Sequence, residues 1–336
     1  MKKSSDIIVA AALIAGIVLF FVLNLSFGDG NVPFNQTLTI LTGGTAENST
    51  WSFIVEHRLN RSIVAIMGGG ALAVSGLILQ VFFRNPLAGP GVLGVTSGAS
   101  LGVALVVMGG LTLSSFFQSS AIIIAGVVGA FSVLLLLLFL SKYIKNQITL
   151  LVVGLMIGYF VSALVNVLFL AATEAETRAY VIWGLGSFEK LSSAEVALFT
   201  LIIVVFVFFS LLLSKSLNAL VLGEGYAKSL GVNMKSLRFL IVLITSVLAA
   251  VVTVYCGPIS FIGIAVPQLI ILVLKSRKYA WFIPVCFLGG AFLGLASDLI
   301  VRWSDNSLPL NTVTAIIGAP IIIWTIVKLN HQFAKS

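Results

Sequence analysis

The sequence predicts an all-α polytopic membrane protein with about ten transmembrane helices. Hydrophobic residues make up 59% of its 336 residues and charged residues only 9%, whereas a soluble domain is about one quarter charged. The apolar residues gather in ten runs separated by charged or Pro/Gly-rich segments. Most runs approach the length of about twenty residues that an α-helix needs to cross a bilayer. We therefore expect one transmembrane domain over 1–336.

The runs follow one another with short connections. The first follows Lys2 and Lys3 and could be a signal peptide, but it is too long and lacks a small-x-small cleavage site, so we expect a retained helix. The second is rich in Gly, Ala and Ser, which suits a helix packed among other helices. A first helix at about 7–27 and core helices over 59–328 are expected. The runs are 7–27, 62–83, 92–111, 120–140, 148–170, 194–213, 239–256, 259–274, 281–301 and 312–327.

Lysines and arginines orient these spans, because cytoplasmic loops carry an excess of them. Ten spans with both termini inside place fourteen of the 19 Lys and Arg residues on the inner side. The net charge of +8 is therefore a topology signal and does not indicate nucleic-acid binding, since the basic residues are scattered between apolar runs. The polar segment 28–57 then lies outside. The five outer cations are Arg58, Arg61, Arg178, Lys190 and Arg302.

The inner connection 214–238 is the longest of the inner segments and could fold on its own. Gly223 and Gly231 bracket a short predicted helix over 224–230. Glu224 in its first turn and Lys228 near its end complement the helix dipole. Two interpretations remain open, a connector lying on the bilayer surface and a helix that docks a partner.

A Gly-Pro motif occurs twice. Gly89-Pro90-Gly91 follows the second run, and Gly257-Pro258 follows the seventh. These two runs point in opposite directions in the ten-span topology, which is where an inverted repeat would place them. Gly-Pro is common in membrane turns, so the repeat alone favours a transporter only weakly.

The fifth run carries Gly154, Gly158, Ser162 and Asn166 at strict i, i+4 spacing. Such a stripe either lets another helix approach closely or lines a passage for a ligand. Both interpretations remain open.

Ionisable residues inside the runs are scarce. Asp298 lies near the outer end of the ninth run and is expected to pair with Arg302 one turn further on. His57 and His331 have no Cys, Asp or Glu at ligand spacing, so no metal site is assigned. The chain has no Gly-x-x-x-x-Gly-Lys-Ser/Thr motif for ATP and no cluster typical of an enzyme. We expect no cofactor on this chain.

Seven motifs in one order resemble the FecCD-type permeases, the membrane subunits of bacterial ABC importers for iron-siderophore complexes, haem and vitamin B12. The resemblance runs over 58–324. It implies a type II ABC importer permease fold in the bacterial plasma membrane, a homo- or heterodimer of permeases, two cytoplasmic ATPases that bind ATP and Mg²⁺, and an extracytoplasmic substrate-binding protein. The motifs are RLNR, ALAVSGLILQ, RNPLAGPGVLGVTSGASLG, VIWGLGSF, LGEGYAKSLGV, GPISFIGIAVPQL and IIGAPIIIW.

The resemblance also implies roles for single residues. Arg58, Arg61 and Arg302 match positions where family members present arginines to glutamates of the binding protein, and such arginines can form bidentate pairs with carboxylates. The alternative is that they anchor helix ends at the membrane interface. Segment 177–188, with Arg178, Trp183 and Gly186, matches the outer gate.

The inner connection matches the family's coupling helix, which inserts into a groove on the ATPase. Tyr226, Ala227 and Leu230 would supply the contacts. Two departures from the family pattern are Gly89 in place of an acid and Gln268 in place of a histidine, which puts in doubt a polar role at the inner end of the eighth helix. The coupling residues are Gly223, Glu224, Tyr226, Ala227, Leu230 and Gly231.

The expected function is that of an importer permease subunit, not an enzyme, that moves an iron chelate, either a siderophore complex or haem, by alternating access. A cobalamin importer of the same family is the alternative. An ion-coupled secondary transporter is less expected, because such a protein normally needs intramembrane acids and only Asp298 qualifies.

Overall fold

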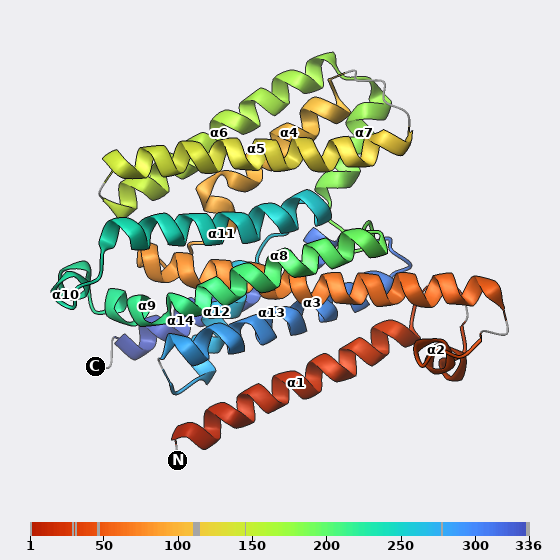
Figure 1. The fold of residues 1–336 in the computed structure, drawn as a ribbon, viewed down its shortest axis with the longest axis horizontal. Helices are drawn as coiled ribbons and strands as arrows, with labels where there is room; N and C mark the ends of the chain where they lie inside the picture. Colours follow the sequence, from red (N-terminus) through yellow and green to blue (C-terminus); the bar gives the residue numbers. More distant parts are fainter. Residues whose placement is uncertain are drawn as a thin grey trace.

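The computed structural model describes residues 2–28, 30, 32–45, 48–109, 115–144, 146–276 and 278–333. All regular structure in these ranges is helical, and the long helices lie roughly along one axis (Figure 1). Within the described ranges, seven helices are long and apolar enough to cross a membrane. They are α1 (Lys2–Ser26), α3 (Ser49–Phe83), α5 (Ser115–Tyr143), α6 (Gln147–Ala171), α8 (Ser193–Leu212), α11 (Met234–Cys256) and α13 (Tyr279–Trp303).

Three further apolar helices correspond to the remaining predicted runs, so the predicted all-α fold is confirmed. They are α4 (Val95–Val107), α12 (Ile262–Val273) and α14 (Leu310–Phe333). Short connecting helices are α2 (Phe34–Leu41), η1 (Pro90–Leu93), α7 (Glu174–Gly184), α9 (Ser214–Val221) and α10 (Glu224–Ser229).

Helix α3 is the centre of the bundle. Its apolar window is 83% buried, against 11% for α1, and it contacts α13, α11, α12 and α8. Gly69 on α3 and Gly290 on α13 lie backbone to backbone, so that a Cβ on either would collide with the other's carbonyl oxygen. The small residues of this run therefore serve close helix packing, as the sequence predicts.

The two Gly-Pro segments meet in space. Pro90 of η1 packs against Gly263 at the start of α12, and Gly263 also faces the Leu72 carbonyl in the middle of α3. Both half-length helices begin after a residue with positive φ, Gly94 for α4 and Phe261 for α12. From this point α4 runs toward α7, whereas α12 runs toward the last turn of α3. This arrangement is typical of the discontinuous helices of an inverted repeat.

The two ends of the bundle differ in their connections. One end carries α2 and α7 and is called the α7 end; the other carries α9, α10 and both chain termini and is called the α10 end (Figure 1). The segment 28–57 contains more helix than a connecting loop would. Asn48 caps α3 by accepting a hydrogen bond from the Thr50 amide at 3.0 Å, so α3 begins well before the apolar run that predicts it.

Candidate functional sites

A buried carboxylate at the α7 end holds two arginines. Asp298 on α13 is 1% exposed. Its Oδ1 accepts a hydrogen bond from Arg61 Nε at 2.8 Å, and its Oδ2 accepts one from Arg302 Nε at 2.9 Å. The predicted Asp298–Arg302 pair is confirmed, and Arg61 of α3 joins it. We call Arg58, Arg61, Arg302 and Asp298 the arginine cluster.

Arg58 and Arg302 bind the end of α1 through its backbone. Arg58 Nη2 donates to the carbonyl oxygens of Gly28 and Gly30 at 2.8 and 2.7 Å, and Arg302 Nη1 donates to the Asn24 carbonyl at 2.7 Å. Helix α1 has little buried surface of its own, so these charge-assisted bonds fix its last turn onto α3 and α13.

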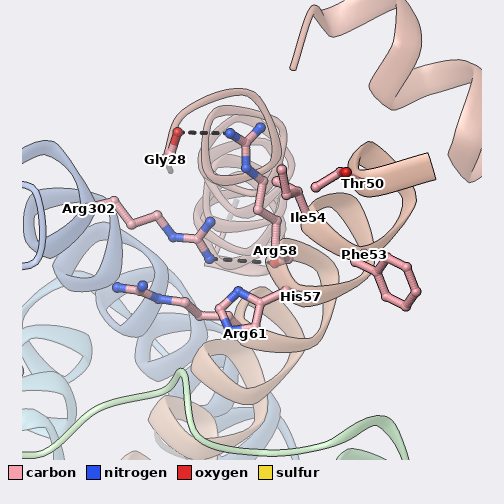
Figure 2. A pocket seen from close by; sticks show the side chains of 8 residues that line it. All are labelled: Gly28, Thr50, Phe53, Ile54, His57, Arg58, Arg61 and Arg302. Atoms are coloured by element: carbon pink, nitrogen blue, oxygen red, sulfur yellow. Dashed lines mark hydrogen bonds between the residues drawn. The ribbon is translucent and has the colours of Figure 1, made fainter. Parts of the chain in front are cut away.

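All three arginines line one cavity of about 220 Å³, shown in Figure 2. The three arginine side chains are largely buried, so a partner group would have to enter this cavity to reach them. A second carboxylate, the half-exposed Glu189, lies 3.2 Å from Arg61 Nη1. The lining residues are Gly28, Thr50, Phe53, Ile54, His57, Arg58, Arg61 and Arg302.

The α10 end carries the predicted coupling element. Gly223 and Gly231, with φ of 125° and 80°, bracket α10, which confirms that two glycines delimit a short helix. Tyr226 and Leu230 are 50% and 59% exposed. Ala227 is fully buried, which corrects its expected role as a partner contact: its small side chain packs inside the element.

Glu224 fixes α10 to the transmembrane helices. Its Oε1 accepts a hydrogen bond from Gln147 Nε2 at 2.8 Å and lies 3.7 Å from Arg238 Nη2. Gln147 begins α6 and Arg238 belongs to the first turns of α11. Glu224 therefore links α10 to two spans.

The three predicted gate residues do not form one group. Arg178 is exposed on α7, whereas Trp183 is buried at its end. Gly186, with φ of 74°, packs beside Gly257, and the Ser187 amide donates to the Cys256 carbonyl at 2.8 Å. Trp183 and Gly186 thus join α7 to the segment after α11, whereas, within the described part of the chain, the exposed Arg178 takes no part in this contact.

The small-residue stripe of α6 is divided. Gly154 and Gly158 lie against Gly94, and Gly158 also lies near Ser97, so the glycine half serves close packing. Ser162 and Asn166 are exposed, and this half is free to face a passage or a second subunit.

The sequence analysis missed a polar contact near the α10 end. Gln268 is buried and donates through Nε2 to Gln80 Oε1 at 2.7 Å and to the Pro86 carbonyl at 3.3 Å. Gln268 therefore does have a polar role at this position: its amide group bonds to that of Gln80 and holds α12 against α3. Glutamines inside two apolar runs were the available signal.

A second cavity lies at the meeting point of the half-length helices. It measures about 220 Å³ and is lined by both Gly-Pro segments, with Pro90, Thr96, Pro258 and Ser260 among its residues. Among the described residues, no group of three His, Cys, Asp or Glu could hold a metal ion. The bundle therefore offers backbone and small polar groups at mid-length.

In the described part of the chain, seven helices of membrane-spanning length, three further apolar helices and a pair of discontinuous helices define a multi-pass membrane permease. A profile of the FecCD transport family matches residues 16–328, and the chain belongs to this family. It is a permease subunit of an ABC importer, which works with permease and ATPase partners; the ATPase of such systems is a separate subunit.

Relatives and a solved structure agree with this assignment. The chain is 29% identical to the hemin transport system permease protein HmuU of Yersinia pestis, over 95% of this chain and 97% of that protein. It is 35% identical to the vitamin B12 import system permease protein BtuC of Vibrio cholerae, over 84% and 86%. A metal-chelate type ABC transporter in an inward-facing conformation matches with a TM-score of 0.82 and 28% identity, covering 96% and 99%.

Proposed function

We propose that two permease subunits, identical or different, form a path for a metal chelate, an iron-siderophore complex or haem, and open it alternately to each side of the plasma membrane. Two ATPases that bind ATP and Mg²⁺ drive the cycle from the α10 end. This end, with both chain termini, faces the cytoplasm. A substrate-binding protein delivers the cargo at the α7 end.

The observation that carries this proposal is the construction of α10. Its exposed Tyr226 and Leu230 offer apolar contacts to a groove, and Glu224 joins it to two spans. An amphipathic helix docked in a groove is a recurrent recognition mode. Closure of the ATPase pair would then displace α6 and α11 through a rigid attachment.

Docking at the α7 end uses the arginine cavity. A glutamate of the binding protein that enters it would meet guanidinium groups of Arg58, Arg61 and Arg302. Guanidinium groups bind carboxylates through charge-assisted and often bidentate hydrogen bonds, which supports recognition of such a glutamate. Burial fixes the guanidinium groups before docking, so that little side-chain entropy is lost on binding.

The cargo is proposed from the relatives. One is described as a hemin permease and the structural neighbour as a metal-chelate type transporter. Cobalamin is the second candidate, because a vitamin B12 permease is 35% identical. Uptake of radiolabelled iron-siderophore, haem and cobalamin into vesicles that contain the complete transporter distinguishes the three.

The test of the coupling element is ATPase association and turnover. The permease is reconstituted with its ATPase and compared with the Tyr226→Asp/Leu230→Asp variant. Leu87→Asp is the control, because Leu87 is also an exposed leucine (48%) in a short connection. We expect the double variant to lose the ATPase and the control to keep it. If no ATPase associates and uptake follows a proton or sodium gradient, the proposal is wrong and Asp298 becomes the residue to study.

A further inference from the structure

The largest of the cavities described here lies at the α10 end and belongs to neither the arginine cluster nor the exposed tip of α10. It measures about 790 Å³ and lies between the last turns of α5, helix α10 and the first turns of α11, three elements that meet at one end of the bundle (Figure 1). Its lining residues are Leu138, Ser141, Lys142, Glu224, Lys228, Met234, Lys235, Ser236, Arg238, Phe239 and Leu240.

Three lysines line this cavity. Lys142, Lys228 and Lys235 are exposed, and no carboxylate in the described part of the chain pairs with any of them. The single acid of the lining, Glu224, is already bound to Gln147 and lies beside Arg238. Three ammonium groups on three different helices therefore line the cavity, and in the described part of the chain none of them forms an ion pair with a carboxylate, which favours an anionic ligand.

Apolar side chains line the same cavity one helical turn further into the spans. Phe239 and Leu240 of α11 are 45% and 38% exposed, and Leu138 and Met234 complete the wall. Lys142 lies in the last turn of α5, and Lys235 lies in the first turn of α11. The cations thus stand where two spans leave the apolar layer, and the apolar wall continues along the spans. A free phosphate would contact only the lysines and would leave the apolar residues of the lining uncovered.

We propose that this cavity binds an anionic phospholipid of the cytoplasmic leaflet. Its phosphate would lie between the three lysines, and the part of its acyl chains next to the headgroup would pack against Phe239 and Leu240. Basic pockets between transmembrane helices on the cytoplasmic side are suited to such headgroups. The assignment to the cytoplasmic leaflet rests on the orientation given under the proposed function, whereas the lipid binding itself does not depend on it.

Lys228 gives this lipid a structural consequence. It is the one lysine of the three on α10, whereas Lys142 and Lys235 belong to α5 and α11. A headgroup held by all three joins α10 to a third span, α5, in addition to the links that Glu224 makes to α6 and α11. Anionic lipid would therefore stiffen the attachment of α10 to the bundle.

The test measures lipid binding to the whole purified permease by native mass spectrometry, with phosphatidylglycerol and phosphatidylcholine as probes. The variant is Lys142→Gln/Lys228→Gln/Lys235→Gln. The matched control, Lys215→Gln/Lys275→Gln/Lys278→Gln, removes three exposed lysines of the same end that do not line the cavity. A lysine near a headgroup is worth roughly fivefold in affinity, so the triple change should weaken phosphatidylglycerol binding roughly a hundredfold.

Support requires that the control and phosphatidylcholine binding stay unchanged. Equal loss in the control variant would show a diffuse charge effect and overturn the site. Retention of phosphatidylglycerol by the cavity variant would overturn it as well.

Competition with soluble phosphates and with the ATPase tests whether either of these occupies the cavity in place of a lipid. If inorganic phosphate or glycerol phosphate displaces phosphatidylglycerol, the cavity is a soluble-anion site and the proposal is wrong. If added ATPase displaces the lipid, the cavity is part of the ATPase interface and the proposal is wrong. These measurements use the permease alone or with added ATPase. The lipid site can therefore be disproved while transport and ATPase coupling are confirmed, and it can be confirmed while they are disproved.

Discussion

The two ends of the bundle use positive charge in opposite ways. At the α7 end three guanidinium groups are buried around Asp298 and around backbone carbonyls of α1. At the α10 end the lysines are exposed around an open cavity. The buried cations hold helices together and are costly to remove, whereas the exposed ones are free for partners. A count of lysines and arginines gives topology but does not distinguish these two uses.

The difference follows from side-chain chemistry. A guanidinium group carries five donors in a planar fork and can satisfy one carboxylate and several carbonyls at once, so it tolerates burial. An ammonium group is a compact and strongly hydrated charge that remains at the surface. In the described residues, arginines make these contacts. Arg58, Arg61 and Arg302 contact Asp298 or the end of α1, and Arg238 pairs with Glu224 of α10.

Asp298→Asn should have the largest effect. It leaves the buried Arg61 and Arg302 without their shared counter-charge, and breaking a buried pair from one side costs about 3–5 kcal/mol. We expect a large loss of folded protein, measured as thermal unfolding in detergent. Glu189→Gln is the control, because Glu189 is half exposed and its loss should cost at most about 1 kcal/mol. Equal effects of the two changes would show that the arginine cluster is not a folding element.

Arg58→Lys should rank second. One ammonium group cannot replace the fork that serves both Gly28 and Gly30. Both glycines are exposed and their carbonyls can bond to water instead, so each lost bond should cost about 0.5–1.5 kcal/mol. Faster hydrogen exchange in the last turn of α1, with α13 unchanged, is the expected result. Arg178→Lys on the exposed face of α7 should change nothing; slow exchange in the Arg58 variant would contradict the prediction.

The sequence predicts those features that depend on local pattern. Ten apolar runs give the helices, Gly223 and Gly231 delimit α10, and one helical turn separates Asp298 from Arg302. It does not predict Arg61 as the second partner of Asp298, because 237 residues separate them and only the packing of α3 on α13 brings them together.

The same limit explains the error at Ala227. The pattern around it predicts a helix but not which face of that helix lies against its neighbours, and a small residue fits either face. The role of Arg58 was likewise hidden, because its acceptors are backbone carbonyls, which leave no mark in the sequence.

Glu224→Gln tests the comparison from the α10 end. The amide keeps an acceptor for Gln147 but loses the charge that faces Arg238 at 3.7 Å. The pair is partly exposed, so we expect a loss of about 0.5–1 kcal/mol in the free energy of unfolding, with a clear loss of ATP-driven uptake because α10 is less firmly attached. Uptake at the wild-type rate would show that Glu224 does not transmit force.

The smallest expected effect on folding comes from the Lys142→Gln/Lys228→Gln/Lys235→Gln variant. Exposed charges without a partner contribute little to stability, so its free energy of unfolding should stay within about 0.5 kcal/mol of the wild type, and relief of repulsion among three cations acts toward greater stability. Thermal unfolding in a neutral detergent without added lipid checks this, because no anionic headgroup is then present.

Phosphatidylglycerol sharpens the same measurement. It should raise the unfolding temperature of the wild type and leave the triple variant unchanged, since a ligand stabilises only the protein that binds it. A strong destabilisation of the triple variant without lipid would instead show that these lysines hold helices together as the buried arginines do, and the contrast between the two ends would fail.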